Sequence, residues 1–266
     1  MKKSTLAQLL VMGSISWSLQ AAQAANIGMP LYEGDIEGKK GSVELYYEQY
    51  KEDYITHSTE YSIPTPKDDY TSSFPDEVEA DRFVARIDYY ASKKFAFYAE
   101  TGTTDFTDSK EKSFLFGAGL RAKVYACSLF DVNLSASMTY IPEVTATLYA
   151  PQTPLGDQYL VFEFSYYKIS GGLTVSKLIP LNTEWKIMPY GGVLVSDMFG
   201  DVDMEALVQQ GEERRSFGLV DQWHDEDEPV SGFVGLGLMF NDTWGIRAEG
   251  QFGGQESYSG GLTYFF

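Results

Sequence analysis

Long stretches of this chain alternate apolar and polar residues, and this period of two constrains the fold more than any other feature. In "TWGIRAEGQF", one parity holds Trp244, Ile246 and Ala248, and the other holds Arg247 and Glu249. Such alternation indicates a β-strand with one apolar face. Similar segments occur near residues 41–52, 82–91, 94–104, 113–125, 131–141, 159–177, 184–198, 231–240, 243–253 and 256–266. Most have about 10–13 residues, close to the 9–11 that a tilted strand needs to cross a bilayer and longer than typical globular strands.

The connections between these segments alternate in length. Short ones lie at 92–94, 127–131, 177–184 and 241–243, whereas long polar ones lie at 53–81, 105–112, 142–158 and 199–230. Residues 253–256 are the exception, a tight turn where the others are long. This pattern is typical of an all-β, up-and-down antiparallel transmembrane β-barrel with short periplasmic turns and long external loops. We predict ten strands, with 8 or 12 as alternatives.

Segment 159–177 is irregular, because its apolar residues change parity along its length. Leu160 and Phe162 share one parity, whereas Ile169 and Leu173 lie on the other. Either a β-bulge near Tyr166–Tyr167 or two short strands with a bend at Gly171–Gly172 would explain this change.

The first 24 residues have the composition of a secretory signal peptide. Lys2 and Lys3 precede an apolar centre, and the small residues Ala22 and Ala24 mark a cleavage site. We therefore predict a signal peptide at 1–24 and an outer-membrane β-barrel domain at 25–266. Downstream of the leader, no run approaches the roughly 20 apolar residues of a membrane helix.

Composition and charge exclude several classes of protein. The formal charge of −18 argues against a nucleic-acid partner, which requires a basic patch. The single cysteine, Cys127, excludes a disulfide framework and a cysteine-based zinc site. Aromatic residues make up 15% of the chain and gather at strand ends, where a membrane barrel carries interfacial girdles and a soluble sandwich does not. The aromatic strand ends are Tyr89, Tyr90, Phe95, Tyr140, Trp185, Trp244 and 264–266.

The chain ends in "LTYFF" and, with its leader and alternating strands, resembles small bacterial outer-membrane β-barrel proteins of the broad OmpA-like class. The resemblance implies an outer-membrane location, contact with outer-membrane lipid and lipopolysaccharide, and a C-terminal signal read by the barrel-assembly machinery. Residues Tyr258, Leu262, Tyr264 and Phe266 match that signal, and Gly260 departs from it. No subfamily motif is present, so no ligand or activity follows from the resemblance.

The charged parity of such a barrel points into the lumen, where opposite charges must pair. The candidates for lumen ion pairs are Arg82, Arg86, Asp88, Glu100, Arg121, Lys123, Glu163, Lys186, Arg247 and Glu249, with Glu44, Glu48 and Lys168 in the same parity. Side chains can fill a barrel of 8–10 strands. We therefore predict an ion-pair plug in a non-enzymatic, porin-like protein with an envelope-structural or surface-interaction role; the alternative is a narrow passive pore for small solutes.

Candidate chemistry is sparse, and we predict no catalytic residue, cofactor or metal site. A second alternative is an outer-membrane protease or lipid A-modifying enzyme that uses His57 or His224 in the external loops. No G-x-S-x-G motif accompanies these histidines. The acidic run 225–228 lacks the spacing of a calcium loop, so a specific calcium site is not expected. The alternative role for this run is loose binding of divalent cations that bridge to lipopolysaccharide. Residues 201–211 are expected to form a short helix over the barrel mouth.

Overall fold

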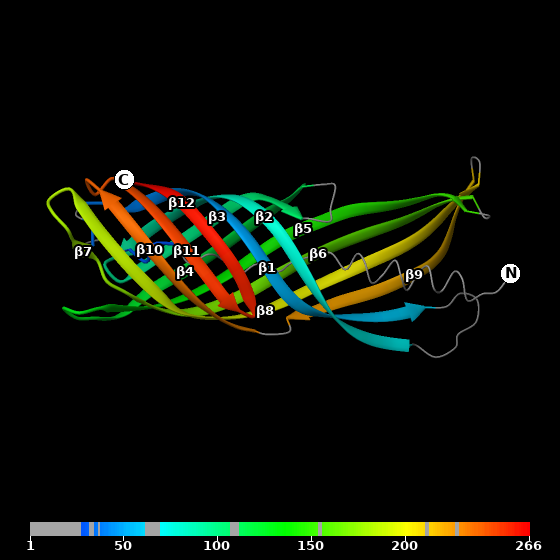
Figure 1. Cartoon of the computed structure of the whole chain (residues 1–266), viewed down its shortest axis with the longest axis horizontal. Coiled ribbons are helices and arrows are strands. Elements are labelled where there is room, and N and C mark those ends of the chain that lie inside the picture. Colours follow the sequence, from blue (N-terminus) through cyan, green and yellow to red (C-terminus); the bar gives the residue numbers. More distant parts are fainter. Residues whose placement is uncertain are drawn as a thin grey trace.

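The computed structural model of the chain is a closed antiparallel β-barrel (Figure 1). It describes residues 28–31, 35–36, 38–61, 70–106, 112–153, 156–210, 213–226 and 229–266, with side chains described mainly in the barrel wall. The strands are β1 (Gly41–Tyr61), β2 (Tyr70–Ser92), β3 (Phe95–Phe106), β4 (Lys112–Ala126), β5 (Asp131–Thr153), β6 (Gly156–Ser176), β7 (Ile179–Pro180), β8 (Trp185–Gln210), β9 (Glu213–Glu226), β10 (Val230–Phe240), β11 (Trp244–Gly253) and β12 (Gln255–Phe265).

Ten of these strands form the wall. Their order around the ring is β1-β2-β3-β4-β5-β6-β8-β10-β11-β12, and every neighbouring pair is antiparallel. The ring closes between β12 and β1, from the pair Ser42 and Phe265 to the pair Glu52 and Gln255. The predicted fold class and ten-strand count are therefore confirmed. The two-residue β7 only pairs with the start of β8.

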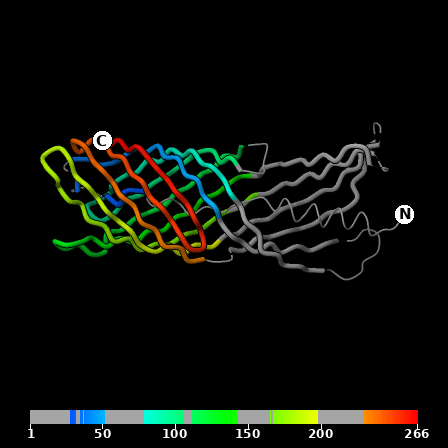
Figure 2. Tube along the Cα trace, in the orientation of Figure 1, coloured from blue at the N-terminus to red at the C-terminus, as the bar shows by residue number. Residues whose placement is uncertain are grey.

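The two ends of the barrel differ. One end, called the turn end below, carries the turns at Lys93–Lys94, 127–130 and 241–243 together with the C-terminal Phe266. Figure 2 shows the start of β1 at this same end, beside the C-terminus. The other end is called the loop end.

The outer face of the wall is apolar and matches a bilayer in height. On β11, Ile246 is 58% exposed whereas Arg247 on the other face is 2% exposed. Trp244 and Phe252 are eight residues apart on this strand, about 27 Å along it at about 3.4 Å per residue. At a tilt of about 40° this becomes about 20 Å along the barrel axis, near the ~25 Å apolar band of transmembrane barrels. The exterior therefore identifies a transmembrane β-barrel.

Aromatic side chains line the turn end of this band. Trp244 packs on Tyr264 with 5.0 Å between ring centroids, and Trp185 packs on Phe240 at 4.7 Å. Tyr89 and Phe266 are also exposed. Tyr90 and Phe265, which were expected in the girdle, point inward instead, at 3% and 1% exposure. They lie on the lumen parity of β2 and β12.

Five wall strands (β1, β2, β5, β6 and β8) continue past the loop end of β12, where long loops were predicted, and β9 joins them there. β1 and β2 stay paired as far as Glu60 and Tyr70, and β9 pairs with both β1 and β8. The backbone order there is β2-β1-β9-β8-β6-β5. The loops predicted at 53–81, 142–158 and 199–230 are thus mostly strand. The predicted helix at 201–211 is wrong, because β8 runs to Gln210 and pairs with β6 and β9 along this stretch. Pairing on both sides satisfies the backbone and outweighs local helix propensity.

Strand β6 is continuous from Gly156 to Ser176, so the predicted bend at Gly171–Gly172 is wrong. The register shift expected near Tyr166 exists, but its extra residue lies on the neighbouring strand β5, between Ile141 and Val144. Pro142 lies in that interval and has no N–H to donate to the ladder, so the bulge forms on β5.

Candidate functional site in the barrel lumen

The inward face of the wall concentrates charge, and its signs balance. Among the described side chains, the fully buried charged residues are five basic (Arg82, Arg86, Arg121, Lys168, Arg247) and five acidic (Glu44, Glu48, Asp88, Glu100, Glu249). They reach the lumen because their strands alternate, so the residues next to each of them along the strand point outward. The chain's large negative charge is therefore not carried by the lumen.

The central contact joins β2 to β3. Arg86 and Glu100 are direct cross-strand partners, and the Glu100 Oε2 accepts from the Arg86 Nη2 at 2.7 Å and from its Nε at 3.0 Å. The Tyr46 hydroxyl donates to the same oxygen at 3.2 Å. The guanidinium lies 4.5 Å from the ring centroid of Tyr98, so a cation–π contact covers its face. Donors from two strands, β1 and β2, thus converge on one buried carboxylate of β3.

A second cluster crosses the seam of the barrel. Arg247 of β11 pairs with Glu44 of β1, although β12 separates these strands. The Arg247 Nη1 also donates to the Ser259 hydroxyl at 3.0 Å and lies 3.9 Å from Glu249. Glu249 in turn accepts from the Tyr190 hydroxyl at 2.8 Å. The cluster ties four strands together across the ring.

Toward the loop end, Arg82 pairs with Glu48 at 2.9 Å and stacks on Tyr50, with its Cζ 3.8 Å from the ring centroid. Both charged side chains are at most 3% exposed. This pair lies on the inner wall, nearer the loop end than the two central clusters.

The remaining predicted lumen residues lie toward the turn end or outside the described side chains. Arg121 pairs with Asp88 on the inner wall. Lys186 lies nearer the rim and contacts Asp242 of a turn at 2.6 Å. The side chain of Glu163 lies outside the described part of the chain, so its predicted role stays a prediction.

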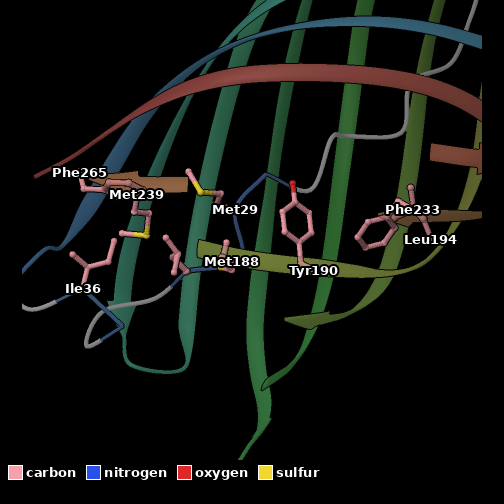
Figure 3. Close-up of a cluster of buried hydrophobic side chains, with 9 residues drawn as sticks. Met29, Ile36, Met188, Tyr190, Leu194, Phe233, Met239 and Phe265 are labelled. Atoms are coloured by element: carbon pink, nitrogen blue, oxygen red, sulfur yellow. The ribbon is translucent and has the colours of Figure 1, made fainter. Parts of the chain in front are cut away.

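A segment that sequence reasoning placed nowhere also fills the lumen. Residues Gly28–Leu31 and Asp35–Ile36, called the N-terminal plug below, lie inside the turn end of the barrel. Met29, Leu31 and Ile36 are buried at 5%, 1% and 0% exposure. Figure 3 shows Met29 and Ile36 among side chains of β8, β10 and β12. The wall residues of this cluster are Met188, Tyr190, Leu194, Phe233, Met239 and Phe265.

Glycines in the wall make room for the plug. A Cβ on Gly237 would lie 2.6 Å from the Met29 sulfur, and one on Gly245 would lie 2.5 Å from the Met29 methyl carbon. On the plug itself, a Cβ on Gly28 would meet the Arg86 guanidinium at 2.5 Å. An added Cβ at these positions would therefore have to move the end of the Met29 or Arg86 side chain.

Polar contacts also hold the N-terminal plug. The Arg121 Nη1 donates to the Met29 carbonyl at 2.7 Å, and both Asp35 carboxylate oxygens lie 2.7 Å from the Lys123 ammonium. Lys123 also contacts Asp131 at 3.3 Å. The plug thus uses two of the cations that the sequence assigned to ion pairs within the wall.

The residues of the alternative enzyme hypothesis lie on the strand extensions. His57 pairs in the backbone with Trp223, and His224 with Thr56, so the two histidines occupy neighbouring positions of β1 and β9. Their side chains lie outside the described part, as does the acidic run 225–228. Within the described ranges, no helix is long and apolar enough to span a membrane, and no three His, Cys, Asp or Glu side chains are grouped to hold a metal ion.

No protein-family model and no curated protein matches this chain. Among solved structures, it is similar to the translocator domain of the autotransporter NalP from Neisseria meningitidis, at 12% identity and a TM-score of 0.41, with 99% of this chain and 98% of that one covered. It is also similar to the outer membrane protease OmpT from Escherichia coli, at 8% identity and a TM-score of 0.38, with 85% of this chain and 97% of that one covered. A third similar structure is Ail, the attachment invasion locus protein of Yersinia pestis, at 10% identity and a TM-score of 0.25, with 85% of this chain and 98% of that one covered. At these scores, no role passes from them to this chain.

Proposed function

We propose that this chain is a non-enzymatic, non-conducting outer-membrane β-barrel whose role is structural or lies in interactions at the cell surface. One observation carries the proposal: buried ion pairs and aromatic rings lie inside the lumen at the level of Arg86, Glu100, Arg247 and Glu44. The apolar exterior supports the outer-membrane location, since transmembrane β-barrels are outer-membrane structures.

The lumen contacts argue against free passage of solutes. Each arginine named above has a buried carboxylate partner, and removing one partner of a buried pair costs about 3–5 kcal/mol. A solute would have to break such pairs in order to pass. The same contacts stabilise a closed wall, which is what a structural protein of the envelope requires.

The strand extensions support a surface role. Five wall strands continue beyond the membrane band and β9 joins them there, and their backbone pairing offers a sheet to the exterior. Their sequence is strongly acidic, with ten acidic and two basic residues between 199 and 230 and nine acidic and one basic between 52 and 81. Such a surface favours divalent cations that bridge to lipopolysaccharide phosphates, or basic partners.

In this proposal, the barrel-assembly machinery recognises the C-terminal strand β12. Tyr258, Leu262, Tyr264 and Phe266 all face outward on β12, at 42–71% exposure. The barrel-assembly machinery could therefore contact these side chains before the ring closes. Export by a signal peptide at 1–24 is part of the same proposal.

Planar-bilayer recording tests the closed state. Refolded wild-type protein is expected to give no stable single-channel steps. A variant with Glu44, Arg86, Glu100 and Arg247 all changed to alanine is expected to give small steps, which shows that the assay detects an opened lumen. Asp105→Ala, which removes an exposed ion pair with Lys112, serves as the matched control. Stable steps from the wild-type protein would overturn the proposal and make the narrow passive pore the function.

A further inference from the structure

We propose that the turn end of the lumen is a binding site for a small amphiphile with an apolar body and an anionic group, and that the N-terminal plug occupies this site as a removable internal substitute. The site lies below the clusters of Arg86 and Arg247. It can therefore open toward the turn end while the lumen stays closed to solutes.

The first reason is an apolar wall in a place where barrels are normally polar. Met188 and Leu194 of β8, Phe233 and Met239 of β10, and Phe265 of β12 point inward and are at most 3% exposed. In Figure 3, Met239, Phe265 and Met188 lie around Met29 and Ile36, whereas Phe233 and Leu194 lie on the other side of Tyr190. Water would solvate this wall poorly, so the wall requires an apolar occupant.

The second reason is a basic wall opposite the apolar one. β4 carries Arg121 and Lys123, and β11 is five places away from β4 in the ring of ten strands. β10 and β12 flank β11, so the apolar side chains face the two cations across the lumen. The plug presents methionine, leucine and isoleucine to one wall and oxygen atoms to the other. Its chemistry is that of an amphiphile with an anionic head.

The third reason is that the plug can leave without leaving either cation unpaired. Arg121 keeps its ion pair with Asp88, and Lys123 keeps Asp131 at 3.3 Å. Of the contacts to these two cations described above, the plug contributes one backbone carbonyl and one carboxylate, which the anionic group of a ligand can replace. In the empty site, the two cations are then matched by Asp88 and Asp131, and the opposite wall is apolar.

The fourth reason is a hinge between the plug and β1. Gly38 has φ of 76° and no atom within 4 Å of the position of a Cβ. On its β1 side, Lys39 donates through Nζ to the Phe265 carbonyl at 2.9 Å, and Lys40 donates through its backbone N–H to Phe266 at 2.8 Å. The chain is therefore fixed at Lys39–Lys40, and release of the plug pivots at Gly38 and opens the 3.3 Å hydrogen bond from the Lys39 N–H to the Ile36 carbonyl.

Release of the plug can be measured by alkylation of a cysteine at position 29. In a Cys127→Ser background, Met29→Cys is placed in lipid nanodiscs and treated with a membrane-impermeant maleimide. We expect slow labelling without ligand, since position 29 is 5% exposed, and a saturable acceleration of about tenfold with dodecanoate. Dodecan-1-ol and dodecylammonium have the same chain without the anionic group and are expected to leave the rate unchanged.

Three variants sharpen the test. Asp35→Asn removes the carboxylate that pairs with Lys123, so the plug is held less tightly. It should lower the dodecanoate concentration for half-maximal labelling several-fold. Asp105→Asn makes the same change in an exposed pair outside the lumen and should have no effect. In Met29→Cys with Gly237→Cys, a cysteine sulfur at residue 29 would replace a Cγ that lies 3.2 Å from the Cβ position of residue 237. Oxidation with diamide should therefore lock the plug and abolish labelling until the disulfide is reduced.

Several results would overturn the proposal. Equal acceleration by all three amphiphiles would show a bilayer effect, and no acceleration by dodecanoate would show that no such site opens. Fast labelling without ligand in a protein that keeps heat-modifiable migration would show that the plug is not seated. Conductance steps test the proposed function instead, so the two proposals can fail separately.

Discussion

Arg86 and Glu100 face each other as direct cross-strand partners, and neither side chain is more than 2% exposed. Because burial removes both from water, Glu100→Ala would leave a buried guanidinium without its carboxylate. We expect a loss of about 3–5 kcal/mol in the free energy of unfolding, measured by urea titration of the refolded protein in lipid.

The matched comparison is Asp105→Ala, whose partner Lys112 is 68% exposed. It should change the free energy of unfolding by about 1 kcal/mol or less. The double variant Arg86→Met with Glu100→Leu should recover much of the loss, because two apolar side chains need no partner. Equal effects of the buried and exposed single variants would contradict the pairing.

The lipid-facing wall gives a second prediction. Leu236 is 48% exposed near the middle of β10. Leu236→Arg should destabilise the inserted barrel by about 2–4 kcal/mol, whereas Val124→Arg near the turn end of β4 should cost about 0–1 kcal/mol. In a water-exposed surface both changes would be nearly neutral, so equal small effects in folding titrations would refute the membrane assignment.

Gly235 gives a third prediction, since an added Cβ would lie 2.5 Å from the Tyr190 hydroxyl oxygen. Gly235→Ala should displace that ring, weaken its hydrogen bond to Glu249 and cost about 1–3 kcal/mol. Gly260→Ala is the control, because its Cβ would lie at an ordinary 3.7 Å from the Arg247 carbonyl on the outer face. Thermal unfolding followed by gel migration compares the two.

Cys127 lies in a turn outside the membrane-spanning strands and offers a fourth prediction. Hydrogen bonds with the backbone of Phe130 and then of Leu129 lower the pKa of its thiol. A lowered pKa gives more thiolate at a given pH, so maleimide labelling should reach half its maximal rate at a lower pH than for a free cysteine. In cells, an impermeant maleimide should label it only after the outer membrane is permeabilised. Labelling of intact cells would place the turn end outside.

Alternation was enough to predict most of the wall. On β2 it assigned Phe83 and Ile87 to the outside and Arg82 and Arg86 to the lumen, because the side-chain period of a strand is two. The same rule could have placed Phe265 inward. Its aromatic character instead suggested the girdle, whereas Phe265 belongs to the buried cluster that contains Met29 and Ile36 of the plug.

The plug itself was beyond sequence reasoning. Residues 28–36 show no periodicity, and the contact between Met29 and Arg121 joins positions 92 residues apart. The strand extensions were missed for another reason. Their acidic, Pro-containing sequence is typical of loops, and pairing with distant strands such as β9 overrides that local preference.

The seam between β1 and β12 has a consequence for the order of events during biogenesis. The N-terminal plug lies inside the ring, and the ring is completed by joining the first strand to the last. The plug must therefore be enclosed while β1 and β12 join, or enter the finished ring from one of its ends.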